Sequence, residues 1–597
     1  MINNNGIQKN TSYQSCEFAA LYLESIEIRN FRGIEECRMT FESDLTVLVG
    51  PNNIGKSRVM RALSLALGTA SASRDDFTVG KNLNPLIDVV FAPSEPPSAS
   101  GEETFDERLR GRLRDAIALV TSEPDRERLA WRTRIRRSLE GHGARIEHLR
   151  LTYNEGKGRW SAPLEHAAAH EVRSVIAADL VNTGRDLAGE MRRPGSPIRQ
   201  VLYDLDIRED ERALIENDLS SLSSMIVTAS GSLAAVRDSL ATLDESVGGV
   251  GAPSLQPLPI RLEEMSRSMS IELDAGAGPL PMRMQGAGAR SLASLQVQGV
   301  LYDRRLGRDG DAPAPHPVSL IEEPEAHLHP QAHFELPSLL TRIRGQVIVT
   351  THSSHLVSEA SPRSLRLLRN DSGLVQAIDL HVTGEQAPDR SRRPSLHKTE
   401  MEKIRRTVER PFGELVFASA VVLGDGATER ALIPALARHC YGSRAQGLCV
   451  VDPGSMGAGL AAAVLKFANL VGLPWLLFAD SDEKGRRSAE KLVRRYGREG
   501  VDHIVWIGTP DDDGREKATE HMMLKSHLNL CRDVCLDLGY DGSGGERSLL
   551  KFMKNHKGTI GSLLATELIK SHPWQTEAEQ WPVPLRELMN RLGTIFR

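Results

Sequence analysis

An apolar run that ends in two adjacent glutamates constrains the fold of this chain more than any other stretch. Residues 318–330 read VSLIEEPEAHLHP, so Glu322 and Glu323 close an apolar segment just before a proline. A buried parallel strand delivers acidic side chains to the carboxyl end of a sheet in this way. At that edge Glu322 can hold the water shell of a magnesium ion, and Glu323 can polarise an attacking water.

A phosphate-binding loop is present upstream of this acidic strand. Residues 45–50 form another apolar run, and PNNIGKS (51–57) leads from it into a helical pattern over 59–67, which together give G-x-x-x-x-G-K-S. Lys56 would reach the outer phosphates and Ser57 the metal, while backbone amides surround the phosphate oxygens. Either motif alone can arise by chance, but the two in this order predict an ATPase that uses ATP and Mg²⁺. The expected loop contacts are Gly50, Asn52, Asn53, Gly55, Lys56 and Ser57.

Three flanking segments narrow the type of ATPase. Residues 21–33 (LYLESIEIRNFRG) resemble the opening strand of RecF-like and SMC-like ABC ATPases, and residues 322–330 resemble their Walker B motif and D-loop. Residues 346–352 (QVIVTTH) resemble the strand that leads to their switch histidine. The resemblance adds Arg32 to the nucleotide-binding residues and gives Glu323 and His352 catalytic roles.

Two other parts of the ABC pattern are degenerate. Residues 285–292 (QGAGARSL) stand where the signature motif should lie, and residues 75–77 (DDF) stand roughly where a Q-loop glutamine would fall. The His-Leu-His of 327–329 admits two interpretations, a metal site or a structural segment, and its D-loop setting favours the structural one. The signature-like residues, which would contact nucleotide, are Gly286, Gly288 and Ser291.

The composition is that of a soluble globular protein. A chain of 597 residues should hold two or more domains. Charged residues make up 26% with a net charge of −5, so nucleic-acid binding has to come from local patches. The six cysteines form no C-x-x-C pair, which gives no indication of a disulfide framework or a zinc site. Without a membrane-spanning apolar run or a signal-peptide core, we expect a cytoplasmic protein with no membrane partner.

The expected fold class is α/β, an ABC-type ATPase domain with a helical insertion and a C-terminal Rossmann-like domain. The insertion shows apolar positions three and four apart, as helical insertions of SMC-like proteins do, and is our candidate dimerisation region. The predicted parts are the first ATPase segment (21–164), the insertion (165–258), the second ATPase segment (259–382), a linker (383–410) and the C-terminal domain (411–597).

Residues 129–138 (LAWRTRIRRS) predict a strand with one arginine face. A helix is expected before it at 103–120, and turns separate further strands at 145–153 and 159–161, which predicts an antiparallel sheet. The arginine face could contact DNA phosphates, or it could be a solvated face paired with acidic residues. The alternating positions are Trp131, Thr133 and Ile135 against Arg132, Arg134 and Arg136.

The C-terminal domain carries a second set of acidic strand ends. Residues 415–423 are an apolar run that leads into GDGATE (424–429), and residues 475–480 (WLLFAD) lead into Asp-Ser-Asp. Acidic groups at the ends of neighbouring parallel strands suit one or two magnesium ions, which a phosphodiester hydrolase uses to activate water and stabilise the leaving oxygen. The four carboxylates are Asp425, Glu429, Asp480 and Asp482.

This arrangement resembles a Toprim domain, in which a glutamate follows one strand and Asp-x-Asp follows another. Asp425 stands where that pattern has glutamate. An SMC-like ATPase followed by a Toprim domain is the layout of the OLD (overcoming lysogenization defect) nuclease family. By this resemblance Glu520 is a third acidic position, and Lys557 is the C-terminal lysine that offsets charge on the cleaved phosphate. Two other lysines, Lys551 and Lys554, compete for that role.

Two functions from different classes fit these motifs. The first is an ATP-regulated, metal-dependent DNA endonuclease or nickase, with Mg²⁺ or Mn²⁺ at its site and a role against phage implied by the resemblance. The second is a RecF-like DNA-binding or repair scaffold that does not cleave. The four carboxylates favour the first, and Asp425 keeps the second open. An ABC site needs a facing subunit, so at least a homodimer is expected, with an accessory defence protein as a further partner.

Overall fold

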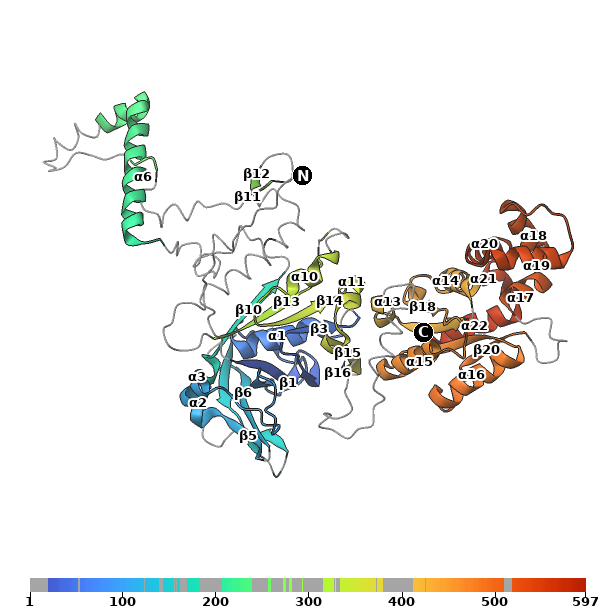
Figure 1. The fold of residues 1–597 in the computed structure, drawn as a ribbon, viewed down its shortest axis with the longest axis horizontal. Coiled ribbons are helices and arrows are strands. Elements are labelled where there is room, and N and C mark those ends of the chain that lie inside the picture. The colour runs from blue at the N-terminus through green and yellow to red at the C-terminus, as the bar shows by residue number, and fades with distance from the viewer. Residues whose placement is uncertain are drawn as a thin grey trace.

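Two sheets organise the computed structural model, the first built from strands within residues 21–379 and the second from strands within residues 420–507 (Figure 1). The first contains twelve strands and the second contains four. The structure describes residues 20–51, 54–122, 124–138, 143–154, 156, 158–161, 169–182, 207–238, 256–258, 272–274, 279–281, 293, 315–326, 328, 333–371, 373–379, 412–424, 426–508 and 518–596.

The parallel part of the first sheet brings together the strands that carry the nucleotide motifs. Its strands are β3 (Leu45–Val49), β10 (Ile176–Asn182), β13 (His316–Glu322), β14 (Gln346–Thr351) and β15 (Leu365–Asp371). They lie in the order β10-β13-β14-β3-β15 and run parallel. Glu322 pairs with Thr350, and Val49 pairs with Thr351. The ends of β13, β14 and β3 therefore meet at one edge, as the sequence predicted.

The rest of the first sheet is largely antiparallel, and one face packs on α1 (Lys56–Leu67). Trp131 is buried there, stacks on Phe91 and donates its indole N–H to the carbonyl of Ala66 at 3.1 Å. The buried side of the predicted arginine strand is thus confirmed. The strands are β1 (Leu21–Phe31), β2 (Ile34–Thr40), β4 (Leu86–Pro93), β5 (Ala118–Ser122), β6 (Asp125–Arg137), β7 (Ala144–Arg150) and β16 (Leu374–Asp379). A small hairpin, β8 (Thr152–Asn154) with β9 (Arg159–Ser161), completes this region.

Two predicted boundaries need correction in this part. The helix expected at 103–120 is short, because α2 (Glu107–Leu113) is followed by a 3-10 turn and then by β5. The helical insertion expected from residue 165 starts later, since α3 (His170–Arg173) leads into β10, which pairs with β13 inside the ATPase sheet. Periodicity alone could not show this, because β10 is a short edge strand whose pairing partner lies far along the chain.

Within the insertion, the structure describes one long helix, α6 (Glu209–Ala229), which confirms the helical pattern there. A two-stranded ladder, β11 (Glu272–Asp274) with β12 (Pro279–Pro281), follows it. No single helix among the described residues is long and apolar enough to cross a membrane. The helix pair Glu209–Ala229 and Gly231–Asp238 passes that test only when taken together, and it is bent by 96°.

The C-terminal domain is built on the parallel sheet β18-β17-β19-β20. Its apolar run at 415–423, expected to be one strand, is instead the end of a helix followed by a strand, because an apolar run alone does not distinguish the two. Its elements are α13 (Phe412–Val416), β17 (Ala420–Gly424), α14 (Ala427–Tyr441), β18 (Leu448–Val451), α15 (Gly459–Val471), β19 (Trp475–Asp480), α16 (Glu483–Tyr496), β20 (Ile504–Ile507), α17 (Thr519–Ser526), α18 (Leu528–Asp537), α19 (Glu546–Asn555), α20 (Lys557–Ser571), α21 (Trp574–Glu577) and α22 (Val583–Ile595).

One apolar core continues from the first sheet into the C-terminal domain. Leu356 and Val357, on α11 (Ser354–Glu359), are fully buried in the same cluster as Leu415 on α13. The ring of His352, at the end of β14, stacks on Phe417, which follows α13, with centroids 6.3 Å apart. The strand that carries the predicted switch histidine is therefore packed against the entry to the second domain.

Candidate functional site

The predicted phosphate-binding loop lies between β3 and α1, and its described residues have features that this role requires. Gly55 has φ 123°, a left-handed value that favours glycine, and a Cβ at Gly50 would lie 2.9 Å from the carbonyl oxygen of Leu368. The Lys56 ammonium is buried and donates to the carbonyl oxygens of Gly50 (2.5 Å) and Pro51 (3.0 Å). Burial lowers the pKa of Lys56 to about 8, against the attraction of nearby carboxylates. Ser57 is exposed on the first turn of α1, and residues 52–53 lie outside the described part of the chain.

Two carboxylates lie at the end of β13, and the charge of one of them, Glu323, acts on Lys56. Burial, and then the charge of Glu323, raise the pKa of Glu322. Glu323 has a backbone φ of 44°, which is rare for a residue with a side chain and is typical of strained functional sites. Its Oε1 lies 3.4 Å from Nε2 of His352. Burial, and then the charge of Lys56, lower the pKa of His352, so its imidazole is mostly neutral at pH 7. The structure thus places the side chains of the two predicted catalytic residues, Glu323 and His352, next to each other.

Glu325, which we did not assign a role from the sequence, holds the histidine segment in place. Its Oε1 accepts hydrogen bonds from the Thr351 hydroxyl (2.8 Å) and from the backbone amides of His352 (2.5 Å) and Ser353 (3.1 Å). In the sequence, the only indication of this role is that Glu325 is the third carboxylate of the Glu-Glu-Pro-Glu run. Glu325 is a positioning residue, because it acts on His352 through the backbone.

Arg32 is fixed by an ion pair. Its guanidinium lies 2.8 Å from the fully buried carboxylate of Asp76, which also pairs with Arg61 at 3.2 Å. Burial would raise the pKa of Asp76, but hydrogen bonds from Arg61 and the Ser73 amide outweigh it, so the pKa is below its usual value. Asp76, near the expected Q-loop position, therefore anchors two arginines. The nucleotide contact of Arg32 stays a prediction.

The signature-like residues and the two histidines of His-Leu-His lie outside the described residues. Their predicted roles stay predictions. They are Gly286, Gly288, Ser291, His327 and His329.

A second acidic centre forms at the carboxyl edge of β17. Glu429 on α14 and Glu520 on α17 are buried, with 4% and 1% of their surface exposed. The Thr428 hydroxyl donates to Glu520 at 2.6 Å, and Lys557, the first residue of α20, lies 3.7 Å from the same carboxylate. Burial chiefly, and then Glu520, raise the pKa of Glu429, although Thr519 and Lys557 act in the opposite direction.

The aspartates of the Asp-x-Asp motif lie on the neighbouring strand. Asp480 ends β19, opposite Ile507, and Asp482 caps α16 by accepting the Gly485 amide at 2.6 Å. Asp425 lies outside the described residues. Within the described part of the chain, no three His, Cys, Asp or Glu side chains are grouped closely enough to hold a metal ion. The structure therefore brings Glu520 and Lys557 into contact, with Glu429 near enough for both charges to act on its pKa, and places Asp480 and Asp482 at the end of the neighbouring strand.

The donor chemistry of this edge still fits a divalent cation. Of the described residues, one lysine, Lys557, lies beside the buried Glu429 and Glu520, so this part of the site has more carboxylates than cations. Carboxylate oxygens are the ligands that Mg²⁺ takes. Of the competing lysines, only Lys557 contacts the acidic pair, whereas Lys551 and Lys554 are exposed on α19.

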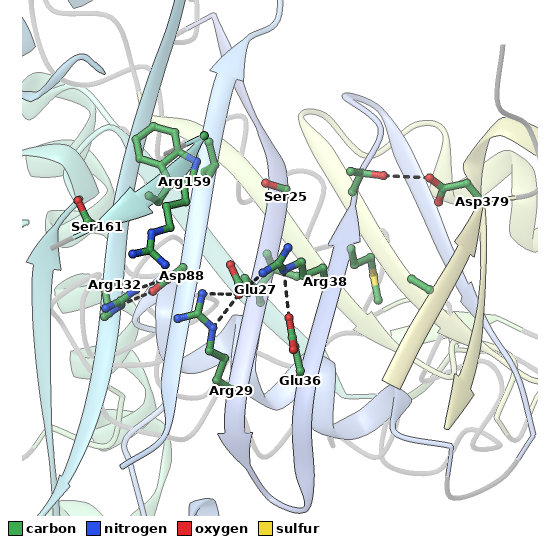
Figure 2. Close-up of a pocket in the computed structure, with 17 residues that line it drawn as sticks. Ser25, Glu27, Arg29, Glu36, Arg38, Asp88, Arg132, Arg159, Ser161 and Asp379 are labelled. Atoms are coloured by element: carbon green, nitrogen blue, oxygen red, sulfur yellow. Dashed lines mark hydrogen bonds and ion pairs between the residues drawn. The ribbon is translucent and has the colours of Figure 1, made fainter. Parts of the chain in front are cut away.

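The arginine face of β6 forms ion pairs within the sheet. Arg132 binds both carboxylate oxygens of Asp88 at 2.7 Å, and Arg136 pairs with Glu147 at 3.1 Å. Figure 2 shows that Arg132 and Asp88 line a groove together with Arg29, Glu27 and Arg38, whose charges are also paired. Of the two interpretations left open by the sequence, the structure supports the face paired with acidic residues.

Comparison with known proteins agrees with this division of the chain. Residues 21–103 and 216–357 match the family described as AAA ATPase domain, and residues 416–482 match the family described as overcoming lysogenization defect protein-like, TOPRIM domain. The protein is thus an ATPase-domain protein that carries a Toprim domain. More particularly, it combines an AAA ATPase domain with an OLD-like Toprim domain, as its sequence motifs predicted.

Relatives of similar length support this architecture. The chain is 28% identical over 502 residues to the uncharacterized protein YbjD of Escherichia coli, covering 79% of this chain and 81% of the relative. It is 22% identical over 499 residues to an OLD nuclease of Thermus scotoductus, covering 79% and 85%. Among solved structures, an Smc head domain from Pyrococcus furiosus, bound to the C-terminal domain of ScpA, is 15% identical with a TM-score of 0.34, covering 60% of this chain and 96% of that one.

Proposed function

We propose that this protein is an ATP-regulated, divalent-metal-dependent DNA endonuclease or nickase. The observation that carries the proposal is the pair of buried carboxylates, Glu429 and Glu520, with the half-exposed Lys557 beside them at the sheet edge of an OLD-like Toprim domain. The Thermus scotoductus relative, named an OLD nuclease, supports the same class.

The acidic centre would hold Mg²⁺ or Mn²⁺ through Glu429, Glu520 and the strand-end aspartates Asp425, Asp480 and Asp482. Such an ion supplies Lewis-acid stabilisation and activates water. Lys557 would offset the negative charge that develops on the scissile phosphate. Burial chiefly raises the pKa of Glu429, and a divalent cation bound beside it would favour its charged form.

ATP would regulate cleavage and not perform it, because the two centres lie on different sheets. The support for communication between them is the contact at the domain junction. His352, which faces Glu323 on one side, stacks on Phe417 near the start of the Toprim domain. If His352 moves when ATP is hydrolysed, its stacking contact with Phe417 would be the first part of the Toprim domain to change.

Assembly into at least a homodimer follows from the single set of ABC motifs in the chain. The insertion remains our candidate interface, and α6 supports it with exposed apolar residues such as Leu214 (66%), Leu222 (49%) and Met225 (65%). Light scattering at micromolar concentration, with and without nucleotide, should show a dimer or larger species. A monomer under both conditions would contradict this part. Defence against phage, with or without an accessory protein, is the cellular role that the family resemblance suggests.

The nuclease proposal is tested with supercoiled plasmid and purified protein, in Mg²⁺ or Mn²⁺, with and without ATP. We expect relaxed or linear product from the wild type and from Lys56→Ala, at an altered rate. Asp480→Ala should give none but should keep ATP hydrolysis. If the wild type gives no product with either metal while it binds DNA in an ATP-dependent way, the protein is a RecF-like scaffold instead. That alternative is favoured by Asp425, which stands where the Toprim pattern has glutamate.

A further inference from the structure

Helix α16, which begins where the Asp-x-Asp motif ends, carries a row of positive charges along one face. Residues 484–498 hold seven lysines and arginines and a single glutamate, in a chain whose net charge is −5. Positions three and four apart share one side of a helix. We call the row formed by Lys484, Arg487, Lys491 and Arg494 the cationic stripe; all four residues are exposed.

The helix is held rigidly by its opposite face. Ala489 and Leu492 are buried in the core of the domain. Arg486 does not belong to the cationic stripe, because its Nε donates to the carbonyl of Ser481 at 2.9 Å and its guanidinium lies over the ring of Trp506. The cationic stripe is therefore carried by a fixed helix, and α16 lies at the lower margin of the domain in Figure 1.

Among the described residues, the charges of the cationic stripe have almost no ion-pair partners. Arg487 pairs with Glu483, but both side chains are about 80% exposed, and such pairs contribute little. No carboxylate of the described residues forms an ion pair with Lys484, Lys491 or Arg494. Like charges three and four residues apart destabilise a helix, and a bound polyanion would remove that cost. The paired arginines of Figure 2 show the opposite arrangement.

The cationic stripe also has a position and length that suit a nucleic-acid backbone. Its first member, Lys484, lies two residues after Asp482, the cap of α16. From residue 484 to residue 494 an α-helix rises about 15 Å, since it gains 1.5 Å per residue. One DNA strand carries a phosphate about every 3.4 Å along the duplex axis, so this length corresponds to roughly four or five nucleotides.

We propose that the cationic stripe binds the phosphate backbone of duplex DNA and holds it beside the acidic centre. The proposal deepens the nuclease function and rests on it, although phosphate binding itself requires no cleavage. Lysine and arginine contacts to phosphates carry no sequence information, so binding through this surface is independent of sequence. Single-strand binders stack bases on aromatic side chains, and no exposed residue of α16 is aromatic, which favours a duplex.

The test is binding of the full-length protein to a labelled duplex of mixed sequence, in EDTA to prevent cleavage, over a range of KCl concentrations. The variant is Lys491→Gln with Arg494→Gln, which leaves the residues next to Asp482 unchanged. Each lost phosphate contact lowers the slope of log K against log salt by about 0.9, so the slope should fall by up to about 1.8. Affinity at low salt should fall at least about tenfold.

The matched control removes two other exposed cations, Arg444→Gln with Lys570→Gln. These residues follow α14 and end α20, whose opposite ends carry Glu429 and Lys557. The control should bind as the wild type does.

An unchanged slope in the variant, or an equal loss in the control, would overturn the proposal even if the wild type nicks plasmid. A larger loss for single-stranded DNA or RNA than for duplex would also overturn it. A further outcome is that the wild type never nicks plasmid while the variant alone shows the reduced slope. In that case the DNA-binding surface would stand and the nuclease function would be rejected.

Discussion

Replacement of Glu325 by glutamine should separate nucleotide hydrolysis from nucleotide binding. One carboxylate oxygen of Glu325 accepts three hydrogen bonds, two of them from the backbone of His352 and Ser353. A hydrogen bond to a charged group contributes roughly 1 kcal/mol more than a neutral one. Three such bonds give an upper limit of about 3 kcal/mol, and because Glu325 is half-buried, solvent reduces this to about 2 kcal/mol.

The expected consequence is a slower chemical step. If weaker positioning of His352 raises the activation free energy of hydrolysis by this roughly 2 kcal/mol, kcat for ATP hydrolysis should fall about 30-fold, since 1.36 kcal/mol corresponds to a factor of ten. No described residue of the loop that holds Lys56 makes a hydrogen bond to Glu325, which acts on Lys56 only through its charge, so the Kd for ATP should change by only a few-fold.

The assay is steady-state hydrolysis together with equilibrium binding of a fluorescent ATP analogue. Glu335→Gln is the matched control, because Glu335 is an exposed glutamate in the same region and should leave both quantities unchanged. Wild-type kcat in Glu325→Gln would refute the positioning role. Equal losses of kcat and of binding would show a general disruption of the site, which thermal unfolding of the variant would confirm.

Three further predictions concern the two centres. Lys56→Ala should abolish ATP binding, whereas Glu323→Gln should bind ATP and fail to hydrolyse it; hydrolysis at the wild-type rate would show that Glu323 is not the catalytic carboxylate. Because burial lowers the pKa of Lys56 to about 8, the ammonium is lost as pH rises through 8. The Kd for ATP should then increase by nearly tenfold per pH unit above 8, and Lys56→Arg should flatten that dependence, since guanidinium stays charged. A side chain of Asp425 reaches about 1.3–1.5 Å less far than glutamate, while magnesium–oxygen distances stay near 2.0–2.1 Å. Mn²⁺ should therefore support cleavage better than Mg²⁺, and Asp425→Glu should narrow that difference; equal cleavage by wild type and Asp425→Ala would show that Asp425 is not a ligand.

The sequence by itself determined the parallel motif-bearing strands of both sheets and the order of their motifs. Buried parallel strands read as continuous apolar runs, and a polar or glycine-rich stop marks the edge at which they end. Gly50, Glu322 and Asp480 could therefore be assigned to sheet edges from local pattern alone. The same logic failed at residues 415–423, where α13 and β17 share one apolar run, because burial on all sides removes the periodicity that distinguishes helix from strand.

Only the tertiary structure decided which side chains meet. The contacts of Glu325 with the His352 segment, and of Glu520 with Lys557 and Thr428, join residues that are distant in the chain. The pairing of Arg132 with Asp88 likewise depends on the register of β6 against β4, which no local pattern records. Hydrogen bonds and ion pairs form between neighbours in space, so a sequence can predict which groups reach an edge, but only the packed fold determines their partners.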